Sequence, residues 1–155
     1  MKYLVLIFVV FFSGCSIKNY ETTKTKIIII KSPKIKFADI GYIRNTNEAI
    51  ELELFIAGSP VEKITINHLV CIGAGCMSKD SFNEEYLSPF YPSELLQNIL
   101  LGQAIYKGIH LVKDKFGFEQ TIRTQNVDIK YTVDSKTILF KDRKNKILFK
   151  IKDTQ

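Results

Sequence analysis

Apolar and polar residues alternate with a period of two along most of the chain, as in β-strands that bury one face. Segment 49–57 places Ile50, Leu52, Leu54 and Ile56 on one side and its glutamates on the other, solvent-facing side. Segment 61–70 repeats the alternation through its isoleucines. Further strands are predicted at residues 26–31, 35–44, 109–113, 118–124, 127–133, 137–141 and 146–152. Because short turns join these strands, the pattern predicts an antiparallel meander with one buried face.

The pattern changes to a helical period in the middle of the chain. Within residues 92–102, the leucines and the isoleucine recur at helical spacing and form an apolar stripe. Pro92 suits the first turn of a helix, and Gly102 suits its end. A shorter helix over 81–87 is indicated by Ser81 and Glu84, which have the spacing of a capping box. We therefore expect mainly antiparallel β structure with one or two short helices, an α+β fold. The 92–102 helix would cover a curved, unclosed, barrel-like sheet.

The first residues follow neither period. Lys2 precedes an unbroken run of ten apolar residues at 3–12, and two small residues separate this run from Cys15. A positive residue, a short apolar run and a small-residue cleavage site are typical of a secretory signal peptide. A helix of ten residues is about 15 Å long, roughly half the hydrocarbon core of a bilayer. The sequence therefore predicts a signal peptide over residues 1–14 and no transmembrane helix there.

Phe12-Ser13-Gly14-Cys15 resembles the lipobox of bacterial lipoproteins. In that family the cysteine sulfur receives a diacylglycerol, the leader is cut before it, and the new amino group is acylated. The resemblance implies that Cys15 is the lipidated N-terminus, with residues 15–24 as the tether and residues 25–155 as a single β-rich domain that faces the periplasm. Two or three acyl chains hold a protein firmly to a membrane, at about 0.8 kcal/mol per buried methylene. An ordinary signal peptide that ends near a cysteine is the alternative.

The residue after the lipidation site indicates which membrane carries the anchor. Lipoproteins with Asp at this position are commonly retained at the inner membrane, whereas this chain has Ser16. The resemblance therefore implies the inner leaflet of the outer membrane. Removing residues 1–14 leaves 141 residues, the size of one domain, and changes the net charge from +6 to +5. Because an exported chain meets no nucleic acid, we interpret the scattered lysines as the solvated face of the strands.

Two cysteines, Cys71 and Cys76, remain in the exported domain. An even pair in an exported domain favours a disulfide, and two of the four residues between them are glycines that permit a tight turn. Two free thiols and a metal or redox site are the alternatives. A redox motif usually has the spacing Cys-x-x-Cys, and zinc would need further ligands near His68 or His110. The apolar neighbours of both histidines favour core or rim positions for them.

No catalytic pattern is present in the sequence. The carboxylates fall at positions that the alternation assigns to solvent, and neither a Gly-x-Ser-x-Gly elbow, a His-Glu-x-x-His motif nor a glycine-rich phosphate loop occurs. We therefore expect a protein that is not an enzyme and that holds no metal or cofactor.

The order of the elements resembles the C-terminal two-thirds of the LolB family. The resemblance runs from residue 49 to 153. It comprises strands, a helix of the form Pro-x-x-Leu-Leu-x-x-Ile-Leu-Leu-Gly at 92–102, a strand containing Ile129-Lys130-Tyr131, and a terminal hairpin over 138–153. LolB proteins are outer-membrane lipoproteins that accept other lipoproteins from the carrier LolA. Their fold is an unclosed antiparallel barrel with helices over its mouth and an apolar cavity between.

Two hypotheses for function follow. In the first, the domain binds the acyl chains of lipids or lipoproteins, delivered by a periplasmic carrier, in a cavity between the sheet and the 92–102 helix. The inward-facing candidates for that cavity are Leu52, Leu54, Ile64, Leu96, Ile99, Leu100, Tyr131 and Phe149. In the second, the chain is a non-enzymatic structural or interaction lipoprotein that supports an envelope assembly through a strand edge or the Cys71–Cys76 loop. The sequence pattern is compatible with both a cavity and a filled core.

Overall fold

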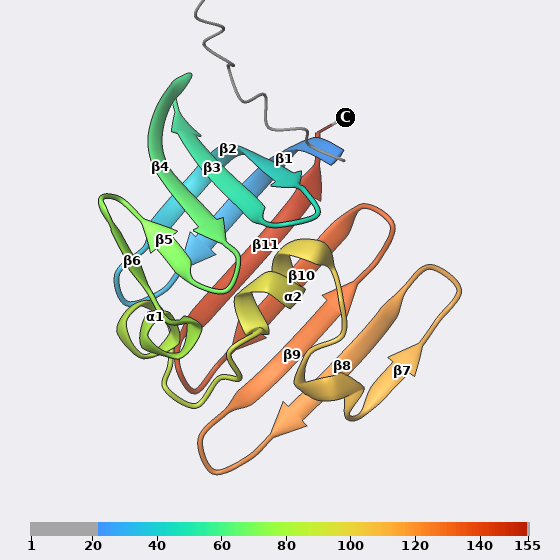
Figure 1. The fold of residues 1–155 in the computed structure, drawn as a ribbon. Coiled ribbons are helices and arrows are strands. Elements are labelled where there is room, and N and C mark those ends of the chain that lie inside the picture. Colours follow the sequence, from blue (N-terminus) through green and yellow to red (C-terminus); the bar gives the residue numbers. More distant parts are fainter. Residues whose placement is uncertain (1–21, 155) are drawn as a thin grey trace, which may run out of the picture.

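A single antiparallel sheet with helices on one of its faces makes up the fold (Figure 1). The computed structural model describes residues 22–154. The strands are β1 (Thr22–Lys31), β2 (Lys36–Asn45), β3 (Ile50–Ile56), β4 (Ser59–Ile66), β5 (Val70–Ile72), β6 (Gly75–Met77), β7 (Leu111–Lys113), β8 (Phe118–Arg123), β9 (Asp128–Val133), β10 (Thr137–Asp142) and β11 (Ile147–Asp153). The helices between β6 and β7 are α1 (Lys79–Tyr86), α2 (Leu95–Leu101) and the short 3-10 helix η1 (Tyr106–Gly108).

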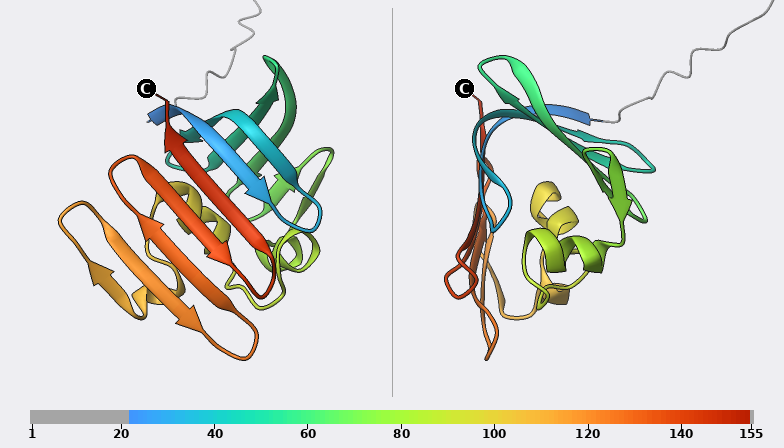
Figure 2. Two further views of the ribbon diagram at one scale, coloured as in Figure 1. Left: turned by 180° about the vertical axis from the view of Figure 1, so that it is seen from behind. Right: turned by 90° about the vertical axis from the view of Figure 1, so that its left-hand side faces the viewer.

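The sheet consists of two meanders joined at its centre. The strand order is β6-β5-β4-β3-β2-β1-β11-β10-β9-β8-β7, so β1 pairs with both β2 and the last strand, β11. The strands β6 and β7 form the two edges, and the sheet curves without closing. Since the chain between these edges carries all three helices, it must cross one face of the sheet, and Figure 2 shows the sheet curved around it. The predicted unclosed antiparallel sheet with a helical cover is therefore confirmed.

The core fills the concave side of the sheet. Residues that alternate along the strands, such as Ile28 and Ile129, are fully buried there, together with Leu95 and Ile99 of α2. Aromatic rings extend this core, because Phe140 makes edge-on contacts with Tyr91, Tyr131 and Phe149 at centroid distances of 5.8–6.2 Å. Of the four residues predicted to share the buried face of segment 49–57, Ile50, Leu52 and Leu54 are buried and Ile56 is not.

The two α-helices lie where the pattern predicts them, but each begins elsewhere. Helix α2 begins at Leu95, because Pro92 to Glu94 form a turn in which the Leu95 amide donates to the Pro92 carbonyl at 2.9 Å. Its predicted end is confirmed, since Gly102 has the left-handed conformation (φ 65°) that terminates helices. Helix α1 is capped by Ser78, whose hydroxyl accepts the Ser81 amide at 3.1 Å. The predicted capping box starting at Ser81 is therefore wrong.

The strand predicted over 61–70 is two strands. Asn67 breaks it, because its carboxamide accepts the Leu69 amide at 2.8 Å and forms a tight turn between β4 and β5. His68 lies in this turn and is exposed, not directed inward with the isoleucines. Ile56 is also 52% exposed, because the pairing of β3 with β4 shifts register after Leu54. The alternation of buried and exposed residues therefore fails at both ends of the β3–β4 hairpin, at Ile56 and at His68.

One further boundary and the burial of one carboxylate differ from the sequence predictions. The strand β1 begins at Thr22, so residues 22–24, assigned to the tether, belong to the sheet. Glu51, assigned to the solvent face, is 1% exposed, and its carboxylate lies 3.0 Å from the Lys63 ammonium on the neighbouring strand β4. A buried carboxylate needs such a partner, and the partner comes from twelve residues further along the chain.

Close packing at Gly41 generates the first prediction. A methyl group at this position would lie 2.6 Å from Ile28 Cδ1 and 2.9 Å from the Glu53 carbonyl oxygen, so the strands would have to move apart. We expect Gly41→Ala to lower the free energy of unfolding by about 1–3 kcal/mol in urea titrations. The control is Gly75→Ala, since a methyl group added there would meet no other side chain or strand within 4 Å. This variant is expected to retain wild-type stability. Equal stability of the two variants would contradict the packing argument.

Candidate functional site

The eight residues predicted to face a cavity all lie in the packed core. Leu52, Ile99 and Tyr131 are 0% exposed, and the most exposed of the eight, Leu96 and Leu100, reach 4%. They come from both meanders and from α2. The sheet and α2 are therefore in direct contact through these side chains, which fill the space between them.

An open hollow lies beside this core, between α2 and the end of the sheet at which β1 begins. Its volume is about 100 Å³. It is lined by Ile43, Leu100, Leu101, Ile138 and Ile151, with Asn45, Lys24 and Lys26 at its polar side. Ligand pockets usually measure about 300–1,000 Å³. We call this space the mouth hollow, and of the eight predicted cavity residues it includes Leu100.

Two further hollows, both more polar, adjoin the mouth hollow. One, of about 170 Å³, is lined by the turn 134–137 and by Lys24 and Lys26. The other, of about 320 Å³, is lined by the turn 45–50. Leu101, the last residue of α2, lines all three. The C-terminal end of α2 is thus the meeting point of the recesses at this end of the sheet.

One of the two lysines at the rim of the mouth hollow, Lys26, has a shifted pKa. Burial, together with the charge of the nearby Lys24, lowers the pKa of Lys26 from its ordinary value. The Lys26 ammonium also forms an ion pair with Asp153 on β11. The rim therefore presents the Lys24 amine, beside the Lys26–Asp153 ion pair, next to an aliphatic surface, which is an arrangement suited to an apolar ligand with an anionic head.

Hydrogen bonds hold the chain around α2 to the sheet. The buried hydroxyl of Tyr131 on β9 donates to the Gln103 carbonyl, just after α2, at 2.9 Å, and burial raises the pKa of this phenol. Gln120 on β8, 0% exposed, accepts the Ile105 amide at 2.8 Å and donates to the Ile109 carbonyl at 2.8 Å. These two side chains fix the segment that follows α2.

Asp142 anchors the segment that precedes α2, a role that the sequence pattern did not indicate. Asp142 is 1% exposed and accepts hydrogen bonds from the Tyr91 hydroxyl at 2.8 Å and from the Asn145 amide group at 2.7 Å. Burial alone would raise the pKa of this carboxyl. The hydrogen bonds from Asn145, Tyr91 and the Asp128 amide outweigh burial and lower the pKa. Burial and the same carboxylate raise the pKa of Tyr91.

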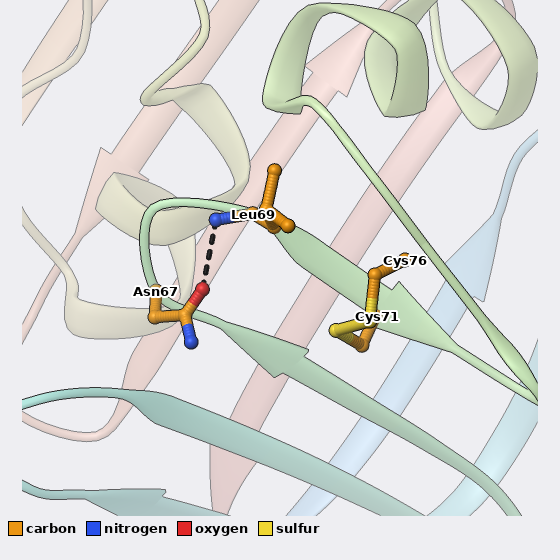
Figure 3. The surroundings of a disulfide bond; sticks show 4 residues. All are labelled: Asn67, Leu69, Cys71 and Cys76. Carbon is orange, nitrogen blue, oxygen red and sulfur yellow. Dashed lines mark hydrogen bonds between the residues drawn. A yellow bond between two sulfur atoms is a disulfide. The ribbon is translucent and has the colours of Figure 1, made fainter.

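Cys71 and Cys76 form the predicted disulfide (Figure 3). They face each other across the hairpin of β5 and β6, with their Cα atoms 4.0 Å apart. Gly73 adopts φ 56° in the turn between them, a conformation that glycine accepts readily. The bond therefore closes the outermost hairpin at one edge of the sheet.

The histidines do not gather into a site. His110 is exposed, as His68 is, and its Nδ1 lies 3.2 Å from the Thr121 carbonyl oxygen. Within residues 22–154, no group of three or more His, Cys, Asp or Glu side chains is placed to hold a metal ion. The structure therefore excludes a core position for His110, which is exposed and has a left-handed backbone conformation (φ 52°).

The predicted lipidation residue, Cys15, and the predicted signal peptide, residues 1–14, lie outside the described residues. In the part of the chain that is described, no helix has the length and apolar character needed to cross a membrane. Comparisons with protein families, curated proteins and solved structures find no match to this chain. The function must therefore be argued from the sequence and the geometry of the domain.

The network around Asp142 generates the second prediction. Because the folded pKa of Asp142 lies below its ordinary value of 3.8, the carboxylate stabilises the fold above that value, and this stabilisation is lost as the pH falls through the folded pKa. We expect Asp142→Asn to cost about 2 kcal/mol at pH 7 and to flatten the loss of stability in acid. Urea titrations across pH measure both effects.

Asp134→Asn is the matched control for Asp142→Asn. Asp134 is an exposed turn residue whose carboxylate accepts backbone amides of Lys136 and Thr137, a role that asparagine can keep. The control is expected to follow the wild-type pH profile. A profile for Asp142→Asn that runs parallel to wild type would show that the carboxylate does not couple the fold to pH.

Proposed function

We propose that this chain is a bacterial lipoprotein whose domain receives an acyl chain at the mouth hollow. Cys15 carries the anchor and places the domain at the inner leaflet of the outer membrane, facing the periplasm. The lipobox resemblance supports the anchor, and the LolB resemblance supports the binding of lipids or lipoproteins. On this proposal the partners are the membrane and the acyl chains of a lipoprotein, handed over by a periplasmic carrier.

The shape of the sheet is the observation that carries the acyl-binding proposal. The sheet curves around α2 without closing, and it leaves an aliphatic recess at one end with two lysines at its rim. Acyl chains bind to aliphatic surface through the hydrophobic effect, and lysines attract anionic headgroups. The mouth hollow also lies at the end of the sheet where β1 begins.

The size of the mouth hollow defines how an acyl chain would enter. At about 100 Å³ the recess is smaller than common ligand pockets, and the core behind it is filled. An acyl chain would therefore displace the C-terminal end of α2, where Leu101 is partly exposed. Segments before and after α2 are held by Asp142 and Tyr131, so the proposed movement is confined to the helix and its last residues.

The filled core favours a second function. With all eight candidate cavity residues at 0–4% exposure, the domain is stable without a ligand, and a lipoprotein of this kind can support an envelope assembly through its surface. Binding, not catalysis, is proposed in both cases. The most buried carboxylates, Glu51 and Asp142, are engaged by Lys63 and by Tyr91 with Asn145, respectively.

The anchor generates the third prediction. We expect Cys15→Ala to move the protein from the membrane fraction to the soluble periplasmic fraction, because alanine cannot be acylated. Ser13 and Gly14 remain in this variant and, with the new alanine, still offer small residues for ordinary leader cleavage. Detergent-phase partitioning and fractionation measure the change, and Ser16→Ala, which keeps the thiol, is expected to remain membrane-bound. A Cys15→Ala protein that stays with the membranes would place the anchor elsewhere.

The mouth hollow generates the fourth prediction. We expect the processed protein to bind a fluorescent fatty acid, and Leu101→Gln to weaken this binding at least about tenfold, since a polar group at the meeting point of the hollows opposes burial of a chain. Leu139→Gln, a partly exposed site on the other face of the sheet, is the control and is expected to bind as wild type does. No binding by wild type, together with a protein partner recovered by cross-linking, would favour the interaction function instead.

A further inference from the structure

Among residues 22–154, the helices all lie on one side of the sheet and leave its opposite face without a helical cover (Figure 2). The sequence places lysines on this opposite face in five neighbouring strands. The strands involved are β9, β10, β11, β1 and β2. We call this surface the cationic face, and its lysines are Lys31, Lys36, Lys130, Lys141, Lys150 and Lys152. Each alternates with a buried apolar neighbour, as Lys31 does with Ile30, so all six point away from the core.

The register of the strands aligns four of these lysines in one row. Lys130 lies opposite Lys141, and Lys31 lies opposite Lys36. Leu148 on β11 is opposite both Lys141 and Lys31 and completes the row across the five strands. Side chains directly opposite in antiparallel strands have Cβ atoms about 4.5–5.5 Å apart, and like charges in such pairs destabilise the sheet. The fold thus contains two repulsive cross-strand pairs on its solvent face.

The acidic residues nearest this row lie at its flanks or are already paired. Asp128 on β9 shares the face with Lys130, but its carboxylate is paired with Arg123 at 3.3 Å and with Arg143 at 3.8 Å. Glu119 on β8 pairs with Lys130 at 3.1 Å, and Glu53 lies on β3 at the other side. Within the described residues, the solvent-facing positions of β10, β11, β1 and β2 carry no Asp or Glu. The centre of the cationic face therefore keeps an uncompensated positive charge.

Aliphatic side chains accompany the lysines. Ile27 and Ile40 lie opposite each other on β1 and β2 and are 41% and 43% exposed. Lys152 lies opposite Ile27 on the other side, and Lys150 lies opposite Ile29. Amines on long apolar stems, next to exposed isoleucines, suit the headgroup region of a membrane, where the charge meets phosphate and the aliphatic groups meet the upper acyl chains.

We propose that the cationic face docks on the anionic phospholipid headgroups of the membrane that holds the anchor. The inference rests on the proposed anchor, because the seven residues from Cys15 to Glu21 can reach at most about 25 Å and would keep the domain next to that membrane. With this face on the bilayer, α2 and the mouth hollow lie on the side of the sheet away from the lipid. This docking would orient the anchored domain on the bilayer, and anionic headgroups would determine that orientation.

Lysine footprinting tests the docking. The processed protein is reconstituted into vesicles of phosphatidylcholine, or of phosphatidylcholine with phosphatidylglycerol, and its amines are acetylated and read by mass spectrometry. We expect acetylation of the cationic face to slow at least about threefold only with phosphatidylglycerol. At an ionic strength of about 1 M, where the Debye length is about 3 Å, this protection should disappear. Lys113, Lys115 and Lys136, exposed on the hairpins, are internal controls expected to react equally in both vesicles.

A charge reversal separates docking from folding. Lys31→Glu replaces a repulsive cross-strand pair with an attractive one to Lys36, so we expect the Tm to rise by roughly 1–4 °C. The same change removes two units of positive charge, and protection of the other lysines on anionic vesicles is expected to fall at least about twofold. Lys113→Glu, on the edge strand β7, carries the same change in charge and is expected to leave the protection unchanged.

Each outcome decides the proposal. Equal acetylation in the two kinds of vesicle, or protection that persists at high salt, would overturn it. Protection in intact cells but not in anionic vesicles would also overturn it and would assign the face to another polyanion or to a protein. The mass of the N-terminal peptide in the same samples reports lipidation of Cys15. A bare thiol there would refute the anchor, while vesicle-dependent protection of the added protein would still report on the docking face.

Discussion

The antiparallel pairing of β1 with β11 is the interaction on which the structure depends. The first and last strands meet at the centre of the sheet and join two meanders that would otherwise be separate small sheets. Each half alone would leave an apolar face exposed to water, which is unfavourable. Once the two halves are joined, their apolar faces form one concave surface. The folding of this domain therefore requires contacts between residues more than a hundred positions apart.

The same pairing determines where the helices lie. Because β1 and β11 occupy the centre, the strands in the middle of the sequence, β6 and β7, lie at opposite edges. The chain between them has to cross the sheet, and its apolar stripe directs it over the concave side. Tyr131 and Asp142 then fix the crossing segment by hydrogen bonds on both sides of α2. The position of the mouth hollow is thus a result of strand order as much as of local sequence.

Local patterns were sufficient for much of this fold. Alternation identified the strands and the buried face, and the helical stripe with Gly102 identified α2 and its end. The patterns failed where a distant partner decides the environment of a residue. The alternation predicts that Glu51 faces solvent, but Glu51 is buried and paired with Lys63. Asp142 lies between two predicted strands, but its carboxylate accepts a buried hydrogen bond from the Tyr91 hydroxyl. Helix α1 is capped by Ser78 and not by Ser81. Both residues have a hydroxyl that could cap a helix, so the sequence alone does not show which one does.

The edges of the sheet affect how closely copies of the protein can be crowded together without pairing strand to strand. The strands β6 and β7 are three residues long, and the disulfide closes the hairpin at the β6 edge. Short edge strands offer few free backbone groups to a neighbouring chain, so strand-by-strand growth between copies is disfavoured. If the proposed anchor holds, molecules tethered at high surface density would accordingly resist β-sheet aggregation, and the bilayer could carry a crowded but dispersed population.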